Sequence, residues 1–299
     1  VILDVEMPEM DGLETLTEIR KCQPRLPVIM FSSLTERGAS VTLEALALGA
    51  NDYVTKPSNS GNRAAALQRV REELIPRIKT FCRDILTPVT TPTPIQAPVF
   101  KSRPALGLPL SSKPISTEPT SIPILTARPR LRVDIVAVGV STGGPNALAV
   151  LLPQLSAQFP VPIVVVQHMP PIFTRMLAER LATQSALSVA EGIAGEPLKP
   201  GQLWIAPGGF HMIVERKGTQ VRLQLHQGDP ENSCRPAVDV LFRSVAEVYH
   251  GNVLAVILTG MGQDGLRGCE AIYKAGGYIL AQDEASSVVW GMPGAVVKA

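Results

Sequence analysis

The sequence predicts an α/β protein with two folded parts. Short apolar segments alternate with segments of helical periodicity in both halves of the 299-residue chain, and this alternation is typical of parallel sheets covered by helices. Between the halves, residues 84–130 have a different composition. The hydrophobic fraction of 45% is ordinary for a globular protein with a sizeable core. We therefore expect folded domains over residues 1–83 and 131–299.

In the N-terminal part, strand and helix are expected to alternate three times. The predicted strands cover residues 1–3, 28–31 and 53–55, and the predicted helices cover residues 12–22, 36–48 and the region around 67–74. Gly49 suits the position after the end of a helix. The last helix is expected to break or kink near Pro76, because proline removes a backbone donor and clashes with the preceding turn.

Residues 84–130 predict a tether. Ten prolines fall in this stretch together with many threonines and serines, and no periodicity is sustained. Proline pushes the residue before it towards extended geometry, so the segment is expected to be semi-extended rather than packed.

The C-terminal part predicts a doubly wound, mostly parallel sheet. Its expected strands cover residues 135–138, 163–166, 253–258 and 278–281. Helices are expected to begin at Pro145, after Pro171 and after Pro236, and a final helix is expected between residues 265 and 278. Proline suits the first turn of a helix, where its missing N–H costs nothing. Shorter β segments between residues 187 and 226 are expected to include a hairpin that turns at residues 217–218.

A different polar side chain follows each of three apolar strands: Ser141, His168 and Asp264. The carboxyl ends of parallel strands share one edge of the sheet, so these side chains are expected to meet there. A serine hydroxyl becomes a good nucleophile when a histidine takes its proton, and a carboxylate orients that histidine. The three residues therefore predict a serine hydrolase.

Other interpretations remain open for each of these residues. The Gly-x-Ser-x-Gly pattern around Ser141 resembles the nucleophile elbow of α/β-hydrolases, but the chain order Ser, His, Asp differs from the order in that fold. A dinucleotide-binding loop would need an acidic residue after the second strand, where this chain has His168. Taken singly, His168 could be a structural histidine and Asp264 a helix N-cap.

Composition argues against several other classes of protein. The net charge of +2 predicts no nucleic-acid partner, and the longest apolar stretches are too short to span a membrane. No cysteine pair has metal-ligand spacing. We expect four buried free thiols in a reducing cytosol, and these are Cys22, Cys82, Cys234 and Cys269. The remaining histidines are expected at the surface or in packing, with the first of them bordering the site: His211, His226 and His250.

The C-terminal part resembles the chemotaxis protein-glutamate methylesterase (CheB) family. The matching motifs are G-V-S-T-G-G at 139–144, Q-H-M-P-P at 167–171, I-A-P-G-G-F-H-M at 205–212, R-P-A-V-D-V-L-F at 235–242, L-T-G-M-G-Q-D-G at 258–265 and A-Q-D-E-A-S-S-V-V-W-G-M-P at 281–293. The resemblance implies Ser141 as nucleophile, His168 as general base and Asp264 as its orienting carboxylate. It also implies that Thr142 and Met261 help to position the serine and form the oxyanion pocket.

The same resemblance implies a reaction and its partners. Glutamate methyl esters on methyl-accepting chemotaxis receptors would be hydrolysed to glutamate and methanol, and certain receptor glutamines would be deamidated, without a catalytic cofactor. The protein would act in the cytoplasm without entering the membrane. Two alternatives remain: a phosphorylation-controlled binding module with an inert hydrolase half, or the same hydrolase acting on a different signalling receptor.

Residues 1–83 resemble a response-regulator receiver, which has a flavodoxin-like parallel sheet. The motif D-V-E-M-P-E-M-D-G at 4–12 implies that Asp4 accepts phosphate from a CheA-type histidine kinase, and Ser32, Tyr53 and Lys56 match the switch positions. The family's Mg²⁺-binding acidic pair would precede Val1. We therefore expect a partial receiver, truncated at its N-terminus, that does not bind Mg²⁺ as given. We also expect the chain to stop short of the family's last helix.

Overall fold

The computed structural model describes residues 1–57, 63–82 and 132–299. In it, residues 1–82 and 132–299 belong to one compact unit. The predicted tether lies outside the described residues, and the domain boundaries at 83/84 and 130/131 stay predictions.

The N-terminal part contains the predicted alternation of strands and helices. Its three strands form a parallel sheet in the order β1-β2-β3. Asp11 caps the first helix through a capping box with Glu14, which satisfies two backbone donors at that helix end. The elements are β1 (Ile2–Asp4), α1 (Gly12–Cys22), β2 (Ile29–Ser32), α2 (Glu36–Ala47), β3 (Asp52–Thr55) and α3 (Arg63–Phe81).

Of the break or kink expected near Pro76, the break does not occur, because α3 continues through this residue. Proline removes one hydrogen bond from a helix, and neighbouring side chains anchor the turn on either side. Arg77 donates from Nη1 to the carbonyl of Glu73 and from Nε to Asp52 on β3, at 2.6 and 2.9 Å. Thr80 donates to the carbonyl of Pro76 itself.

The C-terminal part contains a six-stranded sheet in the order β11-β10-β4-β5-β7-β6, with every pairing parallel. A separate antiparallel hairpin joins β8 and β9 and turns after Lys217, as predicted. The strands are β4 (Ile135–Val140), β5 (Ile163–Gln167), β6 (Ser188–Glu191), β7 (Gln202–Ile205), β8 (His211–Lys217), β9 (Gln220–His226), β10 (Val253–Ile257) and β11 (Tyr278–Ala281).

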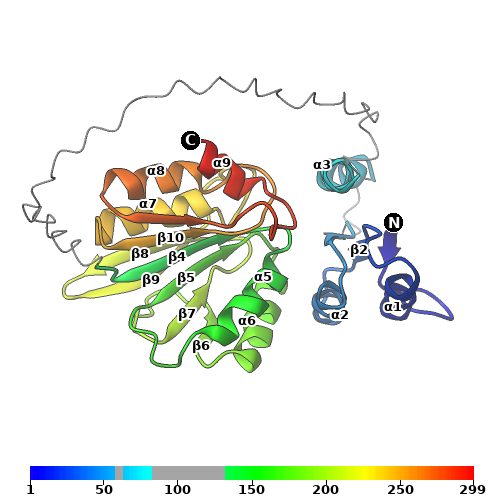
Figure 1. Cartoon of the computed structure of the whole chain (residues 1–299), viewed down its shortest axis with the longest axis horizontal. Coiled ribbons are helices and arrows are strands. Elements are labelled where there is room, and N and C mark those ends of the chain that lie inside the picture. The colour runs from blue at the N-terminus through cyan, green and yellow to red at the C-terminus, as the bar shows by residue number, and fades with distance from the viewer. Residues whose placement is uncertain (58–62, 83–131) are drawn as a thin grey trace, which may run out of the picture. The chain divides into compact units, whose positions relative to one another are not determined.

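Helices cover both faces of this sheet (Figure 1). The helices are α5 (Gly144–Leu151), α6 (Phe173–Gln184), α7 (Val238–Tyr249), α8 (Leu266–Lys274) and α9 (Met292–Lys298), with a 3-10 turn at Leu152–Gln154. Alternate residues of β4 enter two different cores. Val136 and Val138 pack with Phe173 on the α6 side, whereas Ile135 and Ala137 pack with Phe242 on the α7 side. A strand buried on both faces is apolar throughout, which is why its periodicity is lost.

The strand order places a switch point at the centre of the sheet. From β4 the chain moves to β5 on one side and later returns to β10 on the other side. The loops that follow these three strands therefore leave from the same edge, where open α/β sheets bind ligands. Ser141, His168 and Asp264 lie in these loops.

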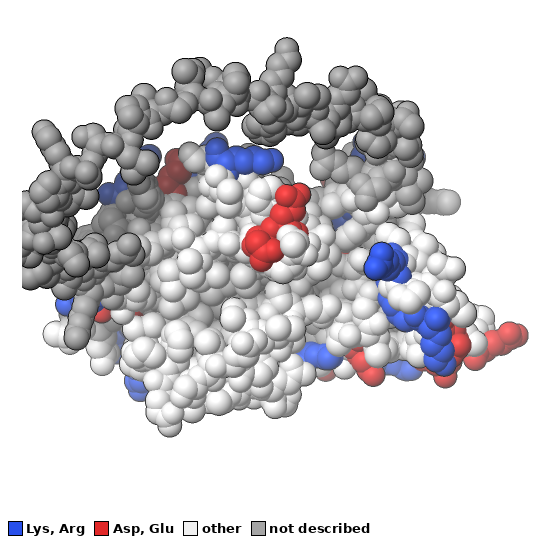
Figure 2. All heavy atoms as spheres, in the orientation of Figure 1, with Lys and Arg blue, Asp and Glu red and all other residues white. Residues whose placement is uncertain are grey.

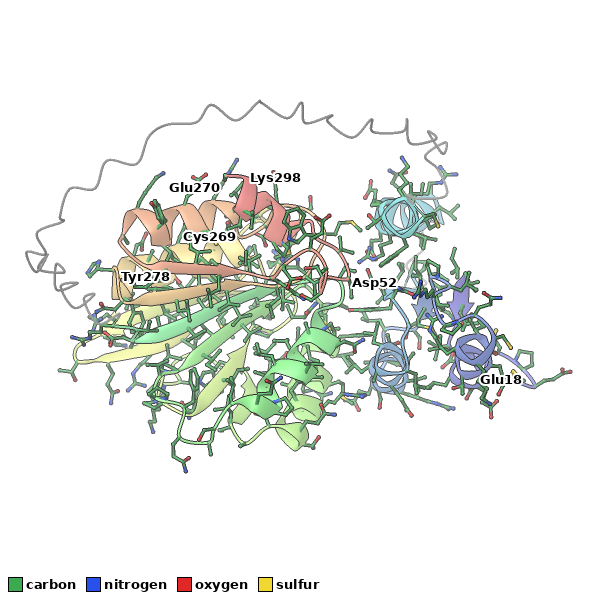
Figure 3. The ribbon with its side chains drawn as sticks, viewed as in Figure 1. Glu18, Asp52, Cys269, Glu270, Tyr278 and Lys298 are labelled. Atoms are coloured by element: carbon green, nitrogen blue, oxygen red, sulfur yellow. The ribbon has the colours of Figure 1, made fainter. Side chains whose placement is uncertain are left out.

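The surface view in Figure 2 shows a largely uncharged face on which lysines and arginines stand in small groups. None of the helices in the described part of the chain is both long enough and apolar enough to cross a bilayer. The four cysteines are free, but the expectation that all are buried is wrong: Cys22 is exposed, Cys82 and Cys234 are half-buried, and only Cys269, on α8 (Figure 3), is buried.

Candidate active site

Ser141 stands in the turn between β4 and α5. Its backbone N–H donates to the carbonyl of Thr259, at 3.0 Å, and its carbonyl accepts from Gly144 and from the side chain of Gln167. A Cβ on Gly144 would lie 1.9 Å from Gln167 Oε1, so only glycine allows this close approach. The turn thus fixes the serine backbone and leaves its side chain at the edge of the sheet.

His168 and Asp264 form a buried hydrogen-bonded pair. Nε2 of His168 lies 2.7 Å from Oδ2 of Asp264, with the histidine side chain 13% exposed and the aspartate 3% exposed. Since an ionised carboxylate only accepts, Nε2 carries the hydrogen. Nδ1 is therefore the nitrogen that holds the free lone pair when the ring is neutral.

Asp264 is held by backbone groups at the beginning of α7. Oδ2 accepts from the N–H of Val238 at 2.7 Å, and Oδ1 accepts from Asp239 N–H and the side chain of Asn232, at 3.1 and 2.8 Å. The interpretation of Asp264 as the N-cap of the following helix is wrong, because Gly265 occupies that position in α8. Its carboxylate instead faces the positive end of α7, which favours negative charge.

The surroundings move the pKa values of this pair in opposite directions. Burial favours the neutral form of Asp264, but hydrogen bonds from His168, Val238 and Asp239 outweigh it and hold the pKa of the carboxyl below its ordinary value. Burial likewise disfavours the charged form of His168. Hydrogen bonds with Asp264 and Cys234 outweigh that effect and raise the pKa of the imidazole to about 10. The resting pair is therefore an imidazolium beside a carboxylate.

Ser141 and His168 line the same small pocket, together with Thr142 and Gly143. No hydrogen bond joins the Ser141 hydroxyl to His168 among the described residues. Catalytic hydrogen bonds are often long in the absence of substrate and tighten when it binds. The structure thus brings the nucleophile and base candidates into one pocket without joining them directly.

Backbone donors near Ser141 suit the stabilisation of an oxyanion. In the described part of the chain, the N–H groups of Thr142 and Met261 donate to no other group. The loop that carries Met261 lies against the serine, since a Cβ on Gly260 would lie 2.8 Å from Ser141 Cβ. Backbone N–H groups are the usual donors in oxyanion holes. The Met261 side chain is not needed for this role.

Two residues of this site were missed from the sequence: Cys234 and Asn232. Sγ of Cys234 lies within 4.8 Å of a ring nitrogen of His168 and contributes to its raised pKa, and Asn232 donates to both Asp264 and Asp239. A single cysteine or asparagine between Glu231 and Arg235 carries no motif of its own, so no sequence signal distinguishes them.

His211 does not border the active-site pockets. It is 1% exposed; its Nδ1 accepts from the N–H of Ala237 and its Nε2 lies 3.0 Å from the carbonyl of Asp229. These contacts support the residue that precedes α7. His211 is therefore a packing residue, one of the two roles expected for it, but the expectation that it lies beside the site is wrong.

Residues of the N-terminal part also line the serine pocket, within the same compact unit. Asp52, whose side chain is labelled in Figure 3, accepts from Thr142 Oγ1 and from Arg77 Nε, both at 2.9 Å. Tyr53 stacks on Phe173 of α6 with ring centroids 4.8 Å apart. The Thr142 side chain is thus engaged by Asp52 rather than by Ser141.

The phosphoacceptor candidate Asp4 lies beside Lys56, as expected. Lys56 Nζ is 2.8 Å from Asp4 Oδ1. Although burial raises the pKa of Asp4, the contacts with Lys56 and the Glu6 N–H lower it overall. The Ser32 hydroxyl does not join this pair. It donates to the carbonyl of Gly38 and accepts from Thr42.

The chain has four histidines, so NMR titration can test the charge of the site. We expect the His168 ring to stay protonated well above pH 7, because its raised pKa means that the fold stabilises the imidazolium; that stabilisation is lost as the pH rises through about 10. His211 is buried, and burial lowers its pKa. As the pH falls, its ring should therefore become protonated only below the pH at which an ordinary histidine does. Cys234→Ser should lower the His168 midpoint and leave that of His211 unchanged. A His168 midpoint near 6.5 would contradict the assignment.

Comparison with known proteins shows similarity over the whole chain. The family described as CheB methylesterase matches residues 136–299, and the response regulator receiver domain matches residues 1–68. A protein-glutamate methylesterase/protein-glutamine glutaminase of Trichodesmium erythraeum is 54% identical over 299 residues, which cover all of this chain and 79% of that protein. One of Nocardioides is 48% identical and covers all of this chain and 76% of that protein.

A solved structure gives the same result for the C-terminal part. The crystal structure of the Thermotoga maritima CheB methylesterase catalytic domain is 46% identical, with a TM-score of 0.55. The match covers 56% of this chain and 88% of that one.

Proposed function

Because the chain belongs to the CheB methylesterase family, we propose that it hydrolyses glutamate methyl esters and deamidates glutamines on chemotaxis receptors. The single observation that carries this proposal is the His168–Asp264 pair, 2.7 Å apart, in the pocket that Ser141 lines. Both reactions are acyl transfers at the same side-chain carbonyl, and they differ only in the leaving group. One nucleophile and one base can therefore perform both.

In the proposed mechanism, the His168 imidazolium first releases its Nδ1 proton to solvent, and Nδ1 then accepts the proton of the Ser141 hydroxyl. Ser141 Oγ attacks the substrate carbonyl, and the negative charge that develops on the carbonyl oxygen is stabilised by the N–H groups of Thr142 and Met261. The imidazolium returns its proton to the leaving methoxide or amide, which leaves the glutamyl group as an ester on Ser141. A water then attacks that ester and gives its proton to His168, which passes it to Ser141 Oγ as glutamate is released. Asp264, fixed by α7, keeps the imidazole oriented and stabilises its charge.

Methanol and ammonia release from purified receptors test the proposal. With methyl-labelled receptors the wild-type chain should release labelled methanol, and with receptors that carry glutamine it should release ammonia. A fluorophosphonate probe should label Ser141 faster than it labels the exposed Ser156. A chain that binds receptors but releases neither product and resists the probe would instead be the binding module. Release from another class of receptor alone would favour the alternative substrate.

We also propose that the N-terminal part restrains the hydrolase and that phosphorylation of Asp4 by a CheA-type kinase relieves the restraint. The support is the pocket itself, since Asp52, Tyr53 and Arg77 line it together with Ser141 and His168. Receptor tails on the cytoplasmic side of the membrane would be the substrate. A new dianion at Asp4 would change the Lys56 contact and so the surface that carries Tyr53.

Removing residues 1–82 is expected to raise the basal rate of methanol release several-fold. The deletion removes Asp52, Tyr53 and Arg77, whose side chains line the pocket that contains Ser141. The rate should be measured at equal concentrations of folded protein, checked by circular dichroism. As a milder variant, Asp52→Asn weakens the contacts with both Thr142 and Arg77 and should give a smaller increase in the same direction. An unchanged or lower rate in both variants would contradict steric restraint.

Magnesium is expected to assist phosphorylation in receivers, and proteins hold Mg²⁺ through one or two carboxylates together with waters and phosphate oxygens. Of these oxygens, the described residues show the Asp4 carboxylate, whose Oδ1 is paired with Lys56. We therefore assign Asp4 the phosphoacceptor role and Lys56 the charge-pairing role, and no step above depends on the metal.

A further inference from the structure

The active site contains a cluster of three metal-ligating side chains. One ring nitrogen of His168, Sγ of Cys234 and one carboxylate oxygen of Asp264 all lie within 4.8 Å of one another. It is the one such group of His, Cys, Asp and Glu side chains in residues 1–57, 63–82 and 132–299. Cys234 has no part in the hydrolysis proposed above.

The chemistry of these ligands suits Zn²⁺. Imidazole nitrogen, thiolate sulfur and carboxylate oxygen are its usual protein ligands, at about 2.0–2.3 Å. Two of them, the thiolate and the carboxylate, carry one negative charge each and would balance the charge of the ion. Three protein ligands leave the fourth tetrahedral position for water. His168 and Cys234 also line a cavity of about 350 Å³, so an ion can reach the cluster.

The residues around the cluster fix its ligands in place. Asp264 accepts hydrogen bonds from α7 and from Asn232, as described above. Cys234 closes a tight turn with Glu231, with mutual backbone hydrogen bonds of 3.1 and 2.9 Å. Arg243 holds Glu231 through two hydrogen bonds. Such supporting contacts orient metal ligands before the metal binds and raise the affinity.

We propose that His168, Cys234 and Asp264 form an inhibitory binding site for Zn²⁺. Binding releases the Cys234 thiol proton and, from the imidazolium, one ring proton to solvent, and Zn–S, Zn–N and Zn–O bonds form. No oxidation occurs. Occupied in this way, His168 cannot accept the Ser141 proton and Asp264 cannot orient the ring. Metal binding stands independently of the proposed function, whereas inhibition rests on it.

Cobalt spectroscopy tests binding without measuring activity. Untagged full-length chain, freed of metal with a chelator, is titrated with Co²⁺ and then with Zn²⁺. We expect a thiolate-to-cobalt charge-transfer absorption that one equivalent of Zn²⁺ removes. Cys234→Ser should lose this absorption and bind Zn²⁺ at least about tenfold more weakly, since even the loss of an outer partner costs 10–100-fold. The controls Cys22→Ser and Cys82→Ser should retain both properties.

The result that overturns binding is a charge-transfer absorption that persists in Cys234→Ser or is absent from the wild type. Circular dichroism of each variant shows that its fold is intact, and His168→Gln gives a second variant that should weaken Zn²⁺ binding.

Inhibition is tested by measuring methanol release during the Zn²⁺ titration. The rate should fall with the same midpoint as the spectral titration, and in Cys234→Ser it should resist Zn²⁺, each rate being normalised to its metal-free value. If Zn²⁺ binds and methanol release does not fall, the proposed inhibition is overturned and the proposed binding stands. No hydrolysis before metal is added overturns the proposed function instead.

Discussion

Replacing Ser141 with alanine is expected to reduce methanol release from methyl-labelled receptors by at least about 10⁴-fold, because removal of a triad nucleophile leaves only binding and oxyanion stabilisation. The fold should be unaffected. The hydrogen bonds of Ser141 to Thr259, Gly144 and Gln167 all use its backbone, so the substitution removes only the hydroxyl.

Methanol is measured under single-turnover conditions, with Ser156→Ala as a control for loss of a hydroxyl at an exposed position. Receptor binding by Ser141→Ala should equal that of the wild type, which separates chemistry from recognition. Methanol release that is unchanged by the substitution would contradict the nucleophile assignment.

The Asp264→Asn variant is expected to lose about 10⁴-fold in hydrolysis, the size of effect seen when the carboxylate of a protease triad becomes an amide. An amide NH2 at the Oδ2 position would face both Val238 N–H and His168 Nε2, which drives the ring to the wrong tautomer. At the Oδ1 position it would face the N–H groups of Asp239 and Gly265 instead. A buried donor left facing another donor also destabilises the fold by about 1–3 kcal/mol.

Asp239 provides a matched control, because Asn232 donates a hydrogen bond to both Asp239 and Asp264. Asp239 is 1% exposed and accepts from Gly268 N–H and from Asn232, but it does not contact His168. Asp239→Asn should cost similar stability in a denaturant titration and much less activity. Equal losses of activity in the two variants, measured where both are folded, would contradict an orienting role for Asp264.

Most elements could be predicted from the sequence because their signals are local. The bounds of α1 follow from Asp11 and its capping box, and β4 and β5 follow from short runs that are buried on both faces. Helix α9 was missed because seven residues with proline near the start show too little periodicity. The helix does not break at Pro76, because Arg77 bonds to Asp52 on β3 and Thr80 donates to the carbonyl of Pro76 within the same helix.

Local sequence patterns were enough to predict the α/β class and the three polar residues at strand ends, because strand ends and glycine turns are encoded within a few residues. The groups that surround those three residues become known from the folded chain. Asp264 meets the beginning of α7, and Cys234 meets His168, through contacts between segments that are far apart in the chain. Such contacts depend on strand order and loop path, which no local pattern specifies. The charge of His168 follows from them, since burial and hydrogen bonds set a pKa only when the chain is folded.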